Sequence, residues 1–130
     1  MIRTSWIASS ALLLALTAEG AQAADGRTLY VENCAACHRP NGVGVPGAFP
    51  TLVGSKVVTG DPKATSRIVL EGRGGMPAFQ GEMDDDEVAA ALTYVRGSWG
   101  NKAKPVQTAD VGAVRGKARR EDARASLQAH

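Results

Sequence analysis

The spacing of apolar residues predicts three helices in the central part of the chain. Apolar positions recur there at helical spacing, and no segment rich in strand patterns or internal repeats is evident. The expected helices are Asp25–Asn33, a segment opened by Asp61-Pro62 and ended by Gly72, and Asp84–Ser98. On the last of these, one face collects Val88, Ala91, Leu92, Val95 and Trp99. We expect this face to pack on the first helix.

Polar residues mark the helix ends. Asp25 and Asp61 are suitable N-caps, and Pro62 suits a first helical position. Asp84 followed by Glu87 resembles a capping box, with Asp in place of Ser or Thr. On the first helix, Leu29 together with Tyr30 or Val31 would face inward.

The segments between the helices are rich in glycine and proline. Residues 39–50 hold three prolines and three glycines, which rule out a helix or a central strand. A second irregular segment runs from Gly72 to Phe79 and contains Met76. Val57-Val58-Thr59 predicts at most a short extended piece.

The N-terminus has the pattern of an export signal. Arg3 is followed by an apolar run from Ile7 to Thr17, and Ala21-Gln22-Ala23 is a small-x-small cleavage pattern. We therefore expect residues 1–23 to be a signal peptide, cleaved on export to the periplasm. The run is too short for a membrane span, and no later stretch suits a transmembrane anchor.

Charge divides the rest of the chain in two. Residues 24–100 contain seven Lys/Arg and nine Asp/Glu, whereas residues 101–130 contain seven and three. We expect 24–100 to be the folded domain and 101–130 a basic extension, partly helical or disordered, with Thr108 capping a short helix. The extension has no aromatic residues for stacking on bases, and we expect no nucleic-acid partner.

The chemistry centres on Cys34-Ala35-Ala36-Cys37-His38, which holds both cysteines of the chain. Cys-x-x-Cys-His is the attachment pattern of c-type haem, with two thioether bonds and an axial histidine. A thioredoxin-type redox pair, a structural zinc site and a small disulfide loop also use Cys-x-x-Cys. A covalent haem would also supply apolar core to a small domain that is poor in aromatic residues.

Met76 is the main candidate for the second axial ligand. It lies in a glycine-rich segment before Pro77, whereas Met83 precedes a capped helix and could pack there as a hydrophobic staple. With both axial positions filled by the protein, the expected function is one-electron transfer. A haem peroxidase or gas-binding protein would require a labile Met76 and a distal base.

Several stretches together resemble class I cytochromes c, over about residues 24–101: Cys34–His38, Pro50-Thr51-Leu52, Gly75–Phe79 and Tyr94-Val95-Arg96. The resemblance implies an all-α fold in which the first and last helices cross and three to four helices surround one haem. It implies His38 and Met76 as axial ligands. It also implies that the carbonyl of Pro50 accepts a hydrogen bond from His38, with Pro46 as a second candidate.

Four stretches carry a narrower resemblance: Val45–Pro50, Gly60–Pro62, Met76–Phe79 and Tyr94–Asn101. In these stretches the chain is similar to cytochrome c subunits and domains that serve bacterial periplasmic dehydrogenases. Those subunits often hold three haems, and this chain has one motif. The resemblance implies a mono-haem carrier between a dehydrogenase or quinol-oxidising complex and a terminal oxidase or reductase, or a fixed dehydrogenase subunit. We expect partners to dock at a haem edge rimmed by Ala35, Ala36, Val45, Pro46, Pro77 and Ala78.

Overall fold

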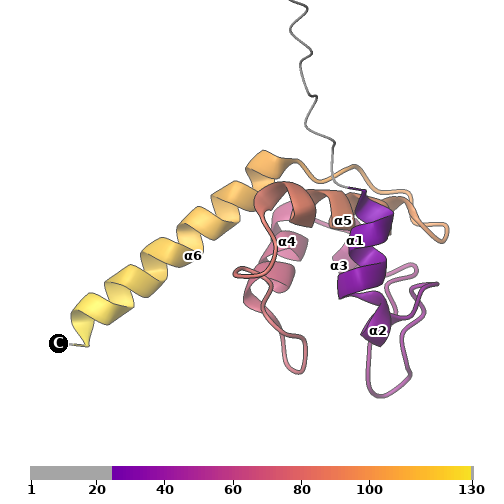
Figure 1. Cartoon of the computed structure of the whole chain (residues 1–130), viewed down its shortest axis with the longest axis horizontal. Coiled ribbons are helices and arrows are strands. Elements are labelled where there is room, and N and C mark those ends of the chain that lie inside the picture. Colours follow the sequence, from indigo (N-terminus) through magenta and orange to yellow (C-terminus); the bar gives the residue numbers. More distant parts are fainter. Residues whose placement is uncertain (1–24, 130) are drawn as a thin grey trace, which may run out of the picture.

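The computed structural model describes residues 25–129, and the chain forms six helices there (Figure 1). They are α1 (Gly26–Asn33), α2 (Ala35–His38), α3 (Lys56–Thr59), α4 (Pro62–Glu71), α5 (Asp85–Gly97) and α6 (Thr108–Gln128). Within this range only two isolated β-bridges occur, so the all-α class is confirmed. The expected signal segment, residues 1–23, lies outside the described residues.

The expected helix caps are present. The Asp25 carboxylate accepts the N–H of Arg27 at 3.1 Å and begins α1. At α5, the Asp84 side chain accepts the N–H of Glu87, and the Glu87 side chain accepts the N–H of Asp84, both at 2.9 Å. This reciprocal pair satisfies two N–H groups that a helix start would otherwise leave unpaired.

Helix α4 has the expected start and stop as well. The Asp61 carboxylate accepts the N–H of Lys63 at 3.1 Å, and Pro62 occupies the first turn. Gly72 follows the helix with φ +75°, a conformation that favours glycine. A side chain there would also lie 2.6 Å from the Met76 carbonyl oxygen.

Three local expectations were wrong. Residues Lys56–Thr59 form a helical turn capped by Ser55, and not an extended piece. Trp99, in contrast, packs its ring against Tyr30 of α1 as expected, from just beyond the end of α5 and with φ +52°. Gln107, and not Thr108, precedes α6, and α6 is one continuous helix that extends well beyond the short one expected.

The crossing of α1 and α5 was expected and is the most extensive contact between two helices of the described residues. Tyr30 is completely buried there, and its ring lies 5.6 Å from that of Tyr94 and 5.1 Å from that of Trp99. Val31 points outward and is half exposed. Gly26 lets the two backbones approach, because a Cβ there would lie 2.2 Å from the Ala90 carbonyl oxygen.

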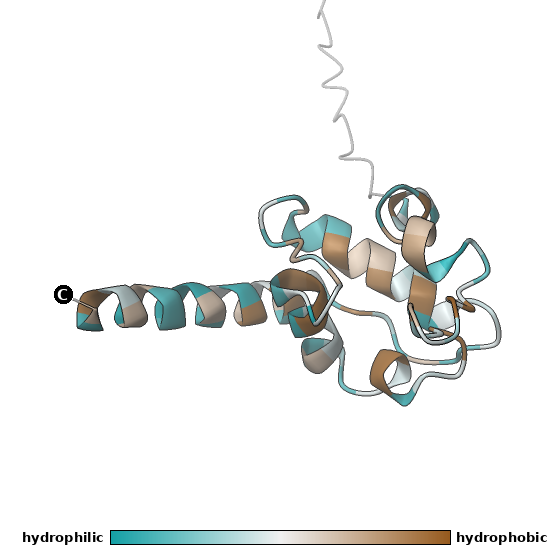
Figure 2. Ribbon diagram, turned by 90° about the horizontal axis from the view of Figure 1, so that it is seen from below, coloured by the Kyte–Doolittle hydropathy of each residue, from teal (hydrophilic) through white to brown (hydrophobic). Residues whose placement is uncertain are grey.

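A second cluster joins α4, α5 and α6. Met83 is buried in it together with Val88, the arrangement of a hydrophobic staple at the start of α5. Val111 and Val114 of α6 are buried in the same cluster. The first half of the basic extension is therefore part of the core, and Figure 2 shows the second half extending away from the other helices.

Gly26→Ala is expected to lower the free energy of unfolding by about 1–3 kcal/mol, because the new methyl group overlaps the backbone of α5. Chemical denaturation of the holoprotein measures the change. Gly81→Ala is the matched control, since nothing lies within 4 Å of its added methyl group. Equal midpoints for the two variants would contradict this account of the crossing.

Candidate functional site

The Cys34–His38 motif lies where α1 gives way to α2. Cys34 interrupts the helix with φ −122° and ψ −34°. The N–H groups of Cys37 and His38 both donate to the Cys34 carbonyl, at 3.2 and 2.9 Å. Both cysteines are half-buried free thiols held one turn apart. This arrangement fits two thioether bonds to one edge of a haem.

His38 is oriented by a proline carbonyl. Its Nδ1 lies 2.9 Å from the carbonyl oxygen of Pro50, so Pro50 and not Pro46 makes this contact. A carbonyl only accepts, and therefore Nδ1 holds the proton and Nε2 keeps its lone pair. Nε2 is thus available to iron, and the hydrogen bond at Nδ1 makes the imidazole a stronger donor.

Gly44 makes this approach possible. It has φ +66°, and a Cβ there would lie 2.3 Å from the Phe49 oxygen and 2.6 Å from the Pro50 oxygen. Its N–H donates to the His38 carbonyl at 3.0 Å. The glycine therefore lets the loop fold back closely on the histidine whose ring Pro50 contacts.

Tyr30 holds the backbone of Arg39, the residue directly after His38. Its hydroxyl donates to the carbonyl of Arg39 at 2.6 Å. Arg39 has φ +64°, an uncommon conformation for a residue with a side chain. Burial raises the pKa of Tyr30 to about 12, so the hydroxyl stays protonated and donates over the physiological range.

Asn101 ties the end of α5 to the segment that follows Pro50. It is 5% exposed. Its Oδ1 accepts the N–H of Gly54 at 2.9 Å, and its Nδ2 donates to the carbonyls of Leu52 and Val95, both at 3.0 Å. The amide thus holds two backbone positions within four residues of Pro50.

Two neighbours of Asn101 contact the same stretch of chain. Gly42 lies against the ring of Trp99, and a Cβ there would lie 2.4 Å from it. Arg96 is 2% exposed and donates to the carbonyls of Val58 and Gly60. The end of α5 therefore contacts the segment between His38 and α4 at several points.

Met76 lies in the loop between α4 and α5. It is half-buried, in a tight turn in which its N–H and carbonyl pair with the backbone of Arg73 at 3.0 and 3.1 Å. In Figure 1 this loop and α2 project from the same side of the molecule. Met83, in contrast, is a core residue.

The other uses of Cys-x-x-Cys fit poorly. Burial raises the pKa of the Cys34 thiol to about 11, whereas a redox-active pair relies on a thiol with a lowered pKa. Among residues 25–129, no group of three or more His, Cys, Asp or Glu side chains gathers to hold a metal ion.

Apolar surface is available to a macrocycle on the segment between α2 and α4. Val43, Phe49 and Val57 are exposed by 46, 39 and 48%. Of the residues expected to rim the docking edge, Ala36, Pro46, Pro77 and Ala78 are exposed and Val45 is half-buried. Ala35 is only 8% exposed because it packs into the core with Tyr30, so its place on the rim was wrong.

The helical fold and its single Cys-x-x-Cys-His motif define a mono-haem class I cytochrome c. The chain belongs to the cytochrome c family whose model is described as "Cytochrome C oxidase, cbb3-type, subunit III", which matches residues 21–95. It is accordingly an electron-transfer protein with covalently bound haem c.

Relatives include subunits of larger proteins. The chain is 34% identical over 111 residues to the gluconate 2-dehydrogenase cytochrome c subunit of Pantoea cypripedii, covering 75% of this chain and 25% of the relative. It is 36% identical over 101 residues to the alcohol dehydrogenase (quinone) cytochrome c subunit of Gluconobacter oxydans, covering 68% and 21%. The chain thus spans about a quarter of the length of these relatives.

A small relative matches over more of its own length. Cytochrome c-552 of Thermus thermophilus is 32% identical over 96 residues, which cover 62% of this chain and 72% of the relative.

In residues 25–129, no helix is both long and apolar enough to cross a bilayer.

The supporting residues were harder to find than the motif. Tyr30 was expected only as one of two inward-facing alternatives. Asn101 was expected only as the last residue of Tyr94–Asn101, a stretch that resembles cytochrome c subunits of dehydrogenases. Their polar atoms bind backbone groups far away in the sequence, up to 49 residues for Asn101. In the sequence, the available signal is an asparagine two residues after Trp99. This signal does not identify the backbone groups that the amide binds.

Asn101→Ala is expected to lower the free energy of unfolding by about 2–3 kcal/mol, because it leaves buried backbone groups without partners. Faster solvent exchange of the His38 Nδ1 proton, followed by NMR, would report loosening at Pro50. Asn41→Ala, at an exposed position with one long contact to Val43, is the control. The interpretation fails if both variants behave like the native protein.

Proposed function

We propose that this chain is a periplasmic carrier of single electrons, with His38 and Met76 as the axial ligands of one haem. The observation that supports it most directly is the hydrogen bond from His38 Nδ1 to Pro50, which leaves Nε2 free to bind iron. Cys34 and Cys37 would hold the haem covalently. Haem iron supplies a one-electron couple, and a thioether opposite imidazole favours its reduced form.

Met76 is proposed as the distal ligand on the chemistry of the available donors. Among the residues described there is no second histidine, and Met83 is buried between α4 and α5. Met76 is half-buried on a loop whose glycine at position 72 permits a tight turn. Its soft sulfur suits haem iron, and a filled sixth position suits electron transfer better than substrate chemistry.

The proposed partners are a periplasmic or membrane-bound dehydrogenase, or a quinol-oxidising complex, as donor and an oxidase or reductase as acceptor. The names of the dehydrogenase and oxidase relatives support this choice of partner class. The exposed Ala36, Pro46, Pro77 and Ala78 offer a small apolar docking edge, as expected of a short-lived complex. Export rests on the pattern of residues 1–23.

A fixed subunit of a dehydrogenase is the second candidate. The matches to two dehydrogenase cytochrome subunits favour it. Affinity purification from the periplasmic fraction separates the two: a stoichiometric dehydrogenase that stays bound at high salt indicates a subunit. A haem protein recovered alone, and reduced by added dehydrogenase at a rate that depends on its concentration, indicates a carrier.

Met76→Ala is expected to abolish the thioether absorption band near the red end of the oxidised spectrum. It should also lower the midpoint potential on the order of 0.1 V or more and let the reduced protein bind carbon monoxide. Met83→Leu is the matched control, because it replaces a buried methionine at similar volume. A red band that survives in Met76→Ala and is lost in Met83→Leu would reverse the assignment.

A further inference from the structure

Helix α6 packs on α4 and α5, and it lies outside the residues that the family model matches. The match ends at residue 95, and α6 begins at Thr108. Val111 is completely buried and Val114 is 4% exposed, so this face of α6 is packed on α4 and α5. An ion pair between Lys63 and Asp110 (3.7 Å) and a hydrogen bond from Thr108 to Asp86 (2.6 Å) accompany this packing.

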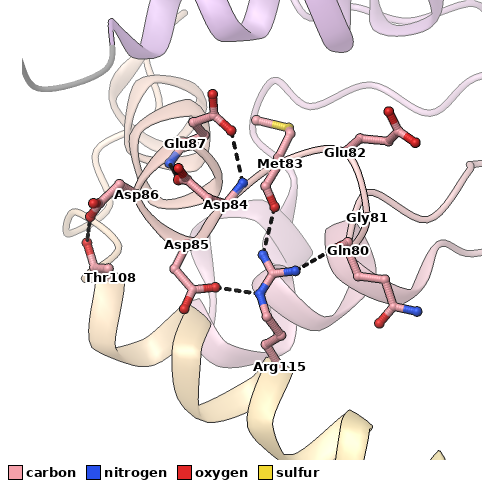
Figure 3. A pocket seen from close by; sticks show the side chains of 10 residues that line it. All are labelled: Gln80, Gly81, Glu82, Met83, Asp84, Asp85, Asp86, Glu87, Thr108 and Arg115. Atoms are coloured by element: carbon pink, nitrogen blue, oxygen red, sulfur yellow. Dashed lines mark hydrogen bonds and ion pairs between the residues drawn. The ribbon is translucent and has the colours of Figure 1, made fainter.

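Arg115 of α6 reaches the segment that connects the Met76 loop to α5 (Figure 3). Its guanidinium donates to the carbonyl of Gln80 and to the carbonyl of Met83, the latter at 2.8 Å. It also pairs with the carboxylate of Asp85 at 2.6 Å. Only 14% of its side chain is exposed, so these charge-assisted bonds are largely shielded from water.

The same segment is held from its other side by α4. The N–H of Phe79 donates to the carbonyl of Val69 at 3.0 Å, and the N–H of Gln80 donates to that of Leu70 at 3.2 Å. Gln80 is thus fixed through its N–H by α4 and through its carbonyl by α6. The bonds to α4 begin three residues after Met76, and the doubly restrained Gln80 lies four residues after it.

Arg115 is surrounded mainly by acidic side chains. It lies in an open pocket of about 760 Å³ and is the only cationic residue among the ten that line it. Five of the others are acidic: Glu82, Asp84, Asp85, Asp86 and Glu87. Without the guanidinium, two carbonyls lose their donor and the acidic side chains lose their only nearby counter-charge in the lining.

We propose that Arg115 is a positioning residue for the distal haem ligand. By fixing Gln80 and Met83, it restrains the return path of the Met76 loop and holds the sulfur on the iron. The inference rests on the proposed Met76 ligation and adds that α6, absent from the family match, determines how firmly Met76 is bound.

The test compares imidazole binding to the oxidised holoprotein, since imidazole binds only when Met76 leaves the iron. Arg115→Ala should raise the apparent affinity for imidazole about tenfold, the effect of losing roughly one charge-assisted hydrogen bond. The thioether band should remain at neutral pH. Arg124→Ala removes the same charge from the exposed end of the same helix and should leave the affinity unchanged.

Two further variants test whether the effect on imidazole affinity depends on the guanidinium group and on Met76. Arg115→Lys keeps the charge and most of the packing but loses the planar fork, so it should still raise imidazole affinity by several-fold. In a Met76→Ala background, Arg115→Ala should have no effect on imidazole affinity, because no sulfur is left to position. An undiminished effect in that background would show that Arg115 acts by another route.

The outcomes also separate this inference from the ligand assignment. A wild-type protein without a thioether band would overturn the Met76 ligation and the inference together. The inference alone would be overturned if the wild-type protein shows the band but Arg115→Ala and Arg115→Lys bind imidazole no more tightly than Arg124→Ala does. A loss of global stability in urea with unchanged imidazole affinity would likewise reduce Arg115 to a structural role.

Discussion

The contact between α1 and α5 is the constraint on which the rest of the structure depends. In this contact Gly26 lies against the backbone of Ala90, where an added side chain would overlap the Ala90 carbonyl. Tyr30 fills the next turn and touches the aromatic side chains of Tyr94 and Trp99. Because Tyr30 also donates to the carbonyl next to His38, the packing of the two helices is transmitted directly to the haem motif.

The two sides of the candidate site are supported by different parts of the chain. The loop that bears Pro50 is held from the end of α5, chiefly through the buried Asn101. The loop that bears Met76 is followed by a segment bonded to both α4 and α6. An electron carrier benefits from such support, because restrained ligands move little when the iron changes oxidation state. Small movements keep the activation free energy of each electron transfer low.

Much of the site was open to prediction because its chemistry is local. Cys34, Cys37 and His38 are adjacent, and a single turn of backbone suffices to set their spacing. The caps at Asp25, Asp61 and Asp84 also involve residues two or three positions apart. The contact of Pro50 with His38 was not local, and only the family resemblance suggested it.

Other features were missed because they depend on distant partners. The segment Lys56–Thr59 has two β-branched valines and would be a poor helix alone, yet Ser55 caps it and Val58 is buried against α5. Helix α6 is polar over much of its length, and its first half is held by the burial of a few apolar residues. Propensity within a short window does not contain this information.

The amino-acid sequence by itself determined the helix class, the starts of α1, α4 and α5 and the haem motif, because these depend on spacing and on groups within one or two turns. Only the tertiary structure decided which carbonyl faces His38, which methionine is buried in the core, and that Arg115 binds the segment after Met76. Each of these depends on residues brought together from separate elements by packing, and side chains that bond to remote backbone groups leave no periodic pattern in the chain.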